Sequence, residues 1–297
     1  MKNDDFGVLY IASGQKHFRE AVASYSSLVS VDKNIPAVFV TDPTNQNDEI
    51  FNRKECQAVI RKDMTFSYFD KAFFVDQSPF KKTLLLDSDT IVLATIKGLK
   101  DILDVFDLAL CLDTSRGKIY YPPPYYDKTP KPYRFLHQYN DGVMLFRKNK
   151  KTQLLLKIWK DLCKKEYNIS YLAGGKFRQR SMTQPSLMLA LGRSDIKLVT
   201  LPYEFNYRLT WGAPDAVGPV RIVHGRVGVD QMSSINNNFD KNEFKKPFRS
   251  IPNPNQLRIY LTKYNYVLWP NDLQSVERFA WMVVKKKILS MLNKDWT

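Results

Sequence analysis

The chain reads Leu84-Leu85-Leu86-Asp87-Ser88-Asp89-Thr90-Ile91-Val92 from residue 84 to residue 92. An apolar run ends at two carboxylates, and a second apolar run follows. Residues i and i+2 of an extended segment point the same way, so Asp87 and Asp89 can converge on one point. An unpaired carboxylate at the end of a buried strand is costly. The pattern therefore predicts a divalent cation at Asp87 and Asp89, and such a cation can hold a diphosphate.

The segments around this stretch alternate between strand and helix patterns. We expect strands at 6–12, 37–41, 57–60, 83–86 and 108–112, with helices at 16–30 and 68–77. Such alternation is typical of an α/β fold with a mostly parallel sheet covered by helices on both faces. Ligands of these sheets bind beyond the carboxyl ends of the strands. The turn after residue 12 and the turn at Asp87 should therefore face one crevice.

The second half of the chain continues the pattern with less regularity. Strands are expected at 142–146, 196–201 and 220–223, and helices at 154–167 and 184–191. Residues 120–135 are rich in proline and tyrosine and should form a loop. Residues 233–255 are polar and mark a boundary. We therefore expect a first domain at 1–232 and a C-terminal extension at 233–297.

The C-terminal extension contains a basic amphipathic pattern at 272–294. Val276, Phe279, Val283 and Ile288 share an apolar stripe, and lysines 285–287 lie beside it. This composition is typical of a helix in a membrane interface. A helix packed on the core with a solvated lysine face would give the same pattern.

The apolar runs, the N-terminal residues and the cysteines indicate where in the cell the protein is expected. No apolar run approaches the roughly 20 residues that span a bilayer, and the N-terminal residues lack the apolar core of a signal peptide. The three cysteines, Cys56, Cys111 and Cys163, form no metal-binding spacing, and Cys111 and Cys163 are expected to be buried thiols. We expect a cytoplasmic protein, either free or peripheral on a membrane.

The formal net charge of +15 predicts an anionic partner: nucleic acid, a phosphate-rich substrate or an anionic membrane surface. The basic residues are scattered and form no recognised nucleic-acid motif, so no nucleic acid is expected.

Residues 78–92, SPFKKTLLLDSDTIV, resemble the metal-binding DxD motif of GT-A-fold glycosyltransferases, especially those of glycosyltransferase family 8. That family includes glycogenin and bacterial lipopolysaccharide galactosyltransferases. Further segments match in the same order: YIASG at 10–14, the helix of Lys71, NDGVMLF at 140–146, TQPSL at 183–187 and VHG at 223–225. The match covers roughly residues 6–228. It implies a Rossmann-like, mixed but mostly parallel sheet flanked by helices, followed by the C-terminal helical extension.

The resemblance also implies a set of site residues. Mn²⁺ (or Mg²⁺) would be held by Asp87, Asp89 and His224. The nucleotide would lie against Tyr10, Ala12, Ser13 and Ser88. The diphosphate would be contacted by Lys71, Gly225 and Arg226, and Gly142 would let the sugar approach the backbone closely.

Three positions depart from the family pattern. Asp141 stands where relatives have a small hydroxyl residue, and Thr183 stands where many have an aspartate. Arg226 follows Gly225, but the usual lysine is missing. Asp141 is therefore the nearest candidate for acid–base chemistry, with Asn140 and Gln184 as its expected partners at the reacting carbon.

The predicted function is transfer of a sugar from a nucleoside-diphosphate sugar, with UDP favoured, to a hydroxyl acceptor in glycan biosynthesis. The acceptor would be a glycan or a lipid-linked glycan. A protein tyrosine acceptor stays open because of the tyrosines at 120–135. The resemblance favours retention of configuration, and Thr183 keeps inversion open.

Two alternatives belong to other classes. A nucleotidyltransferase that makes the activated sugar would need a long Gly-rich loop after the first strand, and residues 13–15 are too short for it. A non-enzymatic nucleic-acid-binding protein would explain the charge but not the two aspartates.

Overall fold

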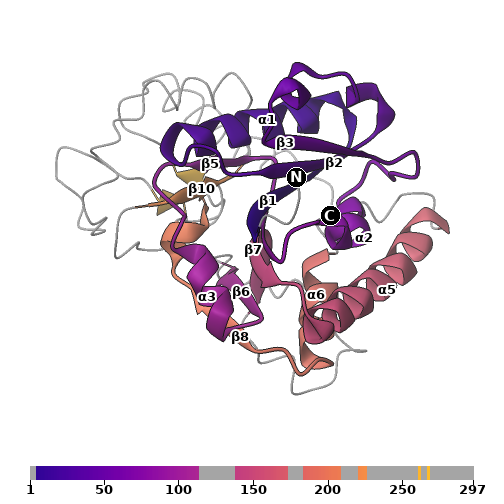
Figure 1. Ribbon diagram of the computed structural model, residues 1–297. Helices are drawn as coiled ribbons and strands as arrows, with labels where there is room; N and C mark the ends of the chain where they lie inside the picture. Colours follow the sequence, from indigo (N-terminus) through magenta and orange to yellow (C-terminus); the bar gives the residue numbers. More distant parts are fainter. Residues whose placement is uncertain are drawn as a thin grey trace, which may run out of the picture.

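Figure 1 shows the computed structural model of the chain. The structure describes residues 5–113, 138–172, 183–208 and 220–225, together with two short strands near the C-terminus. The expected loop at 120–135 and the expected helix at 272–294 lie outside the described residues. The domain boundary near 232 does so as well.

The strands are β1 (Phe6–Ala12), β2 (Ala37–Thr41), β3 (Cys56–Ile60), β4 (Lys82–Leu86), β5 (Thr90–Val92), β6 (Leu108–Leu112), β7 (Tyr139–Arg147), β8 (Leu198–Leu201), β9 (Tyr207–Arg208), β10 (Ile222–His224), β11 (Tyr260–Leu261) and β12 (Tyr266–Val267). The helices are α1 (Gly14–Val31), α2 (Phe69–Phe74), α3 (Leu99–Val105), α5 (Lys150–Leu172) and α6 (Thr183–Gly192). Short 3-10 turns include η3 (Val75–Gln77) and η5 (Tyr203–Phe205).

The main sheet has seven strands in the order β3-β2-β1-β4-β7-β6-β8. Its paired strands are parallel except that β7 runs antiparallel to both β4 and β6. The predicted mixed, mostly parallel sheet is confirmed. Because β7 is reversed, its first residues lie at the same edge as the carboxyl ends of β4 and β6.

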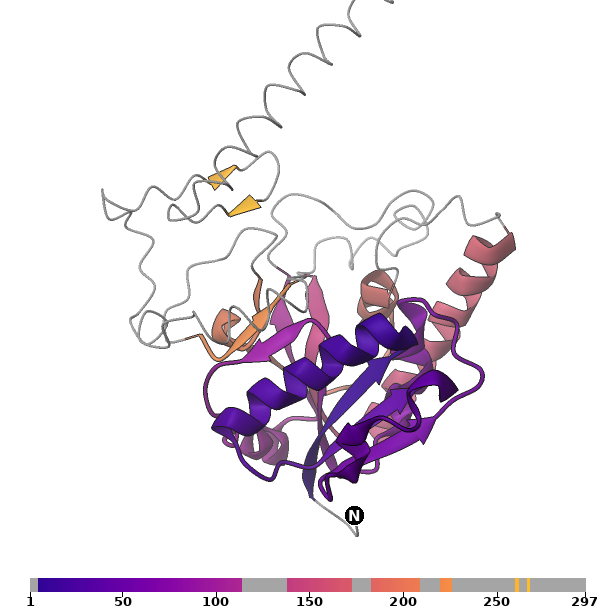
Figure 2. The same cartoon turned by 90° about the horizontal axis from the view of Figure 1, so that it is seen from above.

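Helices cover both faces of this sheet (Figures 1 and 2). Side chains alternate along each strand, so one strand serves two cores. Val8 and Tyr10 pack with α1, whereas Leu9 packs with α2, α5 and α6. Both faces are thus sealed, and the strand ends are where a ligand can meet polar side chains.

Several predicted bounds differ from the structure. The strand expected at 142–146 begins at Tyr139, because β6 pairs with it through Leu112 and a register shift after Leu110. Asn140, Asp141 and Gly142 therefore lie within β7. The strand expected at 220–223 is Ile222–His224, which places His224 in the strand. The α-helix expected at 68–77 ends at Phe74 and continues as η3.

The helix expected at 154–167 spans Lys150–Leu172, since its polar ends carry no apolar signal. Among the helices that the structure describes, none is both long enough and apolar enough to cross a membrane. Cys111 and Cys163 are buried free thiols, as predicted, and Cys56 is a third.

Candidate active site

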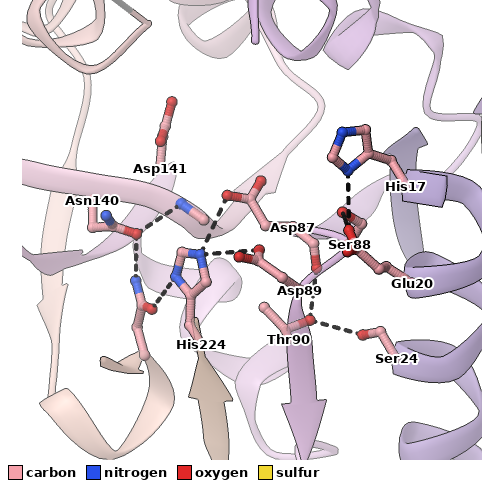
Figure 3. Close-up of polar contacts among 12 residues, drawn as sticks. His17, Glu20, Ser24, Asp87, Ser88, Asp89, Thr90, Asn140, Asp141 and His224 are labelled. Atoms are coloured by element: carbon pink, nitrogen blue, oxygen red, sulfur yellow. Dashed lines mark hydrogen bonds and ion pairs between the residues drawn. The ribbon is translucent and has the colours of Figure 1, made fainter. Parts of the chain in front are cut away.

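Asp87, Asp89 and His224 form one cluster at the carboxyl edge of the sheet (Figure 3). The Nε2 atom of His224 lies 3.5 Å from Oδ2 of Asp87 and 3.4 Å from Oδ1 of Asp89. One ligand atom from each residue lies within 4.8 Å of the others. Neighbouring ligands of a small divalent cation are about 3 Å apart when each lies near 2.1 Å from the ion. The cluster is therefore of a size that can hold such an ion.

Strand pairing brings His224 to the aspartates. Strand β10 runs antiparallel to β5, with His224 opposite Thr90. The N–H of Gly225 donates to the carbonyl oxygen of Asp89 over 3.1 Å. The turn between β4 and β5 thus carries both carboxylates to a histidine that is distant in sequence.

Hydrogen bonds determine which ring nitrogen of neutral His224 carries the proton. The backbone N–H of Gly142 donates to Oδ1 of Asn140 over 3.0 Å, so this oxygen is an acceptor. Asn206 must then direct its Nδ2 donor to that oxygen, over 2.8 Å. Its own Oδ1 faces Nδ1 of His224 at 2.8 Å, so neutral His224 carries its proton on Nδ1. The lone pair of Nε2 is left facing the two aspartates, which is the form that a metal ligand requires.

Gly142 makes this arrangement sterically possible. A Cβ atom at residue 142 would lie 2.0 Å from Cε1 of His224 and 2.9 Å from Oδ1 of Asn140. The carbonyl oxygen of Gly142 also accepts the N–H of Asp87 over 2.8 Å. The close approach predicted at Gly142 is therefore made by the His224 ring, and the side-chain oxygen of Asn140 serves to position that ring.

Lys71 links the cluster to Asp141. Its Nζ atom lies 2.5 Å from Oδ1 of Asp87 and 3.2 Å from Oδ1 of Asp141, and it also donates to the carbonyl oxygen of Asp141. Burial opposes the charge of Lys71, but Asp141 and Asp87 raise its pKa well above the usual value. Burial likewise raises the pKa of Asp87, and Lys71 and His224 outweigh this effect, so that the net shift is strongly downward. Lys71 and Asp87 therefore carry opposite charges at neutral pH.

Asp141 has one carboxylate oxygen available. The residue is buried, and its Oδ2 atom has no hydrogen-bond partner among the described residues. Figure 3 shows its side chain pointing away from the Asp87–Asp89–His224 cluster. A buried oxygen of this kind costs free energy unless a ligand or water satisfies it. Asp141 is thus suited to accept a hydroxyl of a bound sugar or acceptor.

The opposite side of the cluster is formed by helix α1. Ser88, between the two aspartates, donates to Oε2 of Glu20 over 3.4 Å, and Nδ1 of His17 contacts the same oxygen at 3.0 Å. Glu20 is buried, whereas His17 is partly exposed. Glu20 and His17 therefore belong to this edge of the sheet, beside the predicted nucleotide contact Ser88.

The predicted nucleotide residues of β1 divide between edge and core. Ala12 ends β1, and Ser13 precedes the first turn of α1. The side chain of Tyr10 is fully buried, with its hydroxyl bonded to Ser24 and its ring stacked on Phe39. The structure thus places Ala12 and Ser13 at the edge and the Tyr10 side chain in the core.

Gln184 lies near a carboxylate that sequence analysis did not select. Its Nε2 atom donates to Oδ2 of Asp113 over 3.1 Å, and Asp113 directly follows β6. Thr183 is buried, and its carbonyl oxygen accepts the indole N–H of Trp159. Of the other predicted residues, Gly225 follows β10, and Arg226 lies outside the described residues.

Four residues of this edge were not predicted, namely His17, Glu20, Asp113 and Asn206. Asp113 carried a usable signal, because it is an acidic residue directly after an apolar strand. Glu20 reads as one of many polar helix residues. Asn206 precedes a two-residue strand, and only the pairing of β9 with β10 brings it to His224.

The sheet order, the reversed β7 and the flanking helices define the GT-A fold of glycosyltransferases. The galactosyltransferase LgtC, solved with donor and acceptor sugar analogues, shares this fold with a TM-score of 0.50 at 12% sequence identity, over 78% of this chain and 95% of that chain. Mouse xyloside xylosyltransferase 1 matches with a TM-score of 0.52 at 15% identity, over 75% of this chain and 98% of its own. GlyE of Streptococcus pneumoniae matches with a TM-score of 0.52 at 17% identity, over 83% of this chain and 66% of its own.

No family model and no curated protein sequence matches the chain. The resemblance to GT-A glycosyltransferases is thus confirmed at the level of the fold.

Proposed function

We propose that this chain is a metal-dependent glycosyltransferase that uses a nucleoside-diphosphate sugar, with UDP-sugar favoured. The observation that carries the proposal is the Asp87–Asp89–His224 cluster at the carboxyl edge of a GT-A sheet. Two carboxylates and an imidazole whose Nε2 faces them suit Mn²⁺, with Mg²⁺ as the alternative. A cation bound there would supply positive charge that stabilises the departing diphosphate.

The residues around the cluster would divide the remaining work. Lys71 keeps its charge beside Asp87 and would meet phosphate oxygens as a point charge. Ala12, Ser13 and Ser88 lie at the edge where the nucleoside would bind. Gly225 directly follows β10, and Gly225 and Arg226 would contact the diphosphate.

Asp141 is our candidate for the acid–base residue. In the reaction, the bond from the anomeric carbon to the diphosphate oxygen breaks, and a bond to the acceptor oxygen forms. The proton of the acceptor hydroxyl must leave, and the free Oδ2 of Asp141 can accept it directly or from a bound hydroxyl. Gln184, held by Asp113, would contact the sugar. Retention of configuration is favoured.

The acceptor is proposed to be a hydroxyl of a glycan or a lipid-linked glycan. The donor and acceptor sugar analogues bound by LgtC support the class of both substrates. The basic pattern at 272–294 is consistent with an acceptor at an anionic membrane surface.

The central experiment is calorimetric binding of UDP-sugars to the purified chain with and without Mn²⁺. We expect donor binding that needs Mn²⁺ and that Asp89→Asn removes. The matched control is Asp195→Asn, an aspartate whose side chain is 95% exposed. If no nucleoside-diphosphate sugar binds in a Mn²⁺-dependent way, the proposed function is wrong.

A second measurement addresses Asp141. Asp141→Asn should retain Mn²⁺-dependent donor binding and lower the rate of sugar transfer by about 100-fold or more, as expected for loss of an acid–base group. Transfer at the wild-type rate would remove Asp141 from the reaction.

A further inference from the structure

Phe66 is an exposed aromatic residue with a strained backbone. The residue is 64% exposed, and its φ of 54° lies in the left-handed region that a bulky residue seldom adopts. It lies in the loop between β3 and α2. Both features are unfavourable for the isolated chain, so an observed outlier of this kind points to a function.

The loop holds Phe66 in place from both sides. Thr65 donates its backbone N–H and its hydroxyl to Oδ1 of the buried Asp70, each over 2.7 Å. The hydroxyl of Ser67 lies 2.6 Å from that of Thr65 and accepts the N–H of Phe69. Because hydrogen bonds fix the residues on either side, the backbone at Phe66 is already ordered. The entropy cost of ordering this loop when a ligand binds should therefore be small.

The exposed ring lies beside the first turn of α1. A Cβ atom at Gly14 would lie 3.7 Å from Cδ1 of Phe66, which is ordinary contact distance. Gly14 has a φ of +76° and donates its N–H to the buried Asp42 over 2.7 Å. The ring therefore stands next to Ser13–Gly14, at the carboxyl end of β1, where the nucleoside is proposed to bind.

The same segment reaches the phosphate side of the site. Lys71 is five positions after Phe66, in α2, and its ammonium group contacts Asp87 of the metal cluster. Since β1 and β4 are neighbours in the sheet, the turn after β1 and the Asp87 turn lie side by side. Residues 65–71 thus carry an aromatic face at the nucleoside end and a positive charge at the diphosphate end.

We propose that Phe66 is the residue on which the nucleobase of the donor stacks. A nucleobase is flat and has a π face, and aromatic side chains stack on it with little dependence on its identity. Stacking would remove the exposed ring from water, and it would give a reason for the strained backbone conformation that holds the ring at the surface. The inference rests on the proposed function, because it requires that the chain bind a nucleotide donor.

The test separates the base from the diphosphate. Calorimetry with Mn²⁺ present compares UDP with inorganic pyrophosphate for the wild type, Phe66→Ala and Phe66→Trp. Stacking is worth about 1–3 kcal/mol per base, so Phe66→Ala should bind UDP roughly fivefold or more weakly, at 1.36 kcal/mol per tenfold. Its affinity for pyrophosphate should be unchanged, and Phe66→Trp should bind UDP as the wild type does.

The control is Leu154→Ala, which removes an apolar side chain of similar exposure, 52%, from helix α5. The inference is overturned if Phe66→Ala binds UDP as tightly as Leu154→Ala does, or if it loses UDP and pyrophosphate equally. A change of oligomeric state without a change of UDP affinity would also overturn it and would indicate a protein contact. If the wild type binds neither UDP nor pyrophosphate, the proposed function fails with it.

Discussion

Gly142 and His224 approach each other so closely that a Cβ atom on Gly142 would lie 2.0 Å from Cε1 of His224. The ring cannot retreat without losing its bond to Asn206 and its place beside the two aspartates. Gly142→Ala should therefore displace His224. We expect Mn²⁺ affinity to fall at least tenfold and the free energy of unfolding to fall by about 1–3 kcal/mol, the usual cost of overpacking. Calorimetric titration with MnCl₂ and urea unfolding would measure the two effects.

Gly98 provides the matched control for this substitution. A Cβ atom there would meet nothing within 4 Å, and its φ is −68°. Gly98→Ala should leave Mn²⁺ affinity unchanged. Wild-type Mn²⁺ affinity in Gly142→Ala would show that His224 can move without consequence, and would remove it from the proposed metal site.

Asn206 defines the tautomer of His224 without touching the proposed metal site. Its Oδ1 accepts the Nδ1 proton, and its Nδ2 donates to Asn140. Partners of a ligating histidine typically contribute 10–100-fold to metal affinity. We expect Asn206→Ala to lower Mn²⁺ affinity by a factor in this range while the circular dichroism spectrum is retained. Manganese paramagnetic resonance would report the free ion directly.

The exposed Asn52 serves as the control asparagine. It lies in η2 (Glu49–Asn52), in the connection that leads to the start of β3, away from the carboxyl edge of the sheet. Asn52→Ala should bind Mn²⁺ as the wild type does. Equal affinities in Asn206→Ala and Asn52→Ala would show that the hydrogen bonds of Asn206 contribute nothing to metal binding.

The Lys71–Asp87 pair predicts the pH dependence of stability of the metal-free protein. The folded pKa of Asp87 is below its unfolded value of about 3.9. Its stabilisation is therefore present above that pH and is lost as the pH falls through the folded pKa. The folded pKa of Lys71 is raised, so its contribution is complete below roughly pH 10.4 and is lost only as the pH rises through the folded pKa.

From about pH 5 to pH 9 the pair should thus add no slope to stability. Below about pH 4, urea unfolding should show that the wild type loses more stability than Asp87→Asn on acidification. Asp195→Asn should parallel the wild type, because its side chain is exposed. Parallel curves for the wild type and Asp87→Asn would contradict the depressed pKa of Asp87.

The features of this edge that depend on a local sequence pattern could be predicted from the sequence. The i, i+2 spacing of Asp87 and Asp89 after an apolar strand predicted that they converge, and they do, although the turn between β4 and β5, not an extended strand, brings them together. His224 was selected through the resemblance, and its contacts depend on the register of β10 against β5. No local pattern reports such pairings, and Asn206 was missed because only the pairing of β9 with β10 brings it to His224.

The same limit explains the positions that were interpreted differently. Gly142 was expected to admit a sugar, because a glycine in sequence shows only that space is needed and not what fills it. The space is filled by His224. Phe66 drew no attention because an exposed aromatic in a loop has no periodicity, and its backbone conformation is visible only in the structure.

The backbone strain at Phe66 predicts that relieving it will stabilise the fold and weaken ligand binding. A non-glycine residue in the left-handed region costs roughly 1–2 kcal/mol, and glycine does not incur this cost. The side chain is largely exposed, so its removal forfeits little burial. Phe66→Gly should therefore raise the free energy of unfolding, by about 1 kcal/mol or less once the greater entropy of an unfolded glycine is included. It should at the same time weaken UDP binding.

Two further variants separate backbone strain from the ring. Phe66→Ala keeps a Cβ atom and hence the strain, so it should weaken UDP binding without stabilising the fold. Tyr68→Gly removes a ring of similar exposure from a residue whose φ is −58°, so it should destabilise the protein. Urea unfolding of the three variants would measure the differences. If Phe66→Gly is destabilised as much as Tyr68→Gly, the φ of 54° stores no free energy for ligand binding to use.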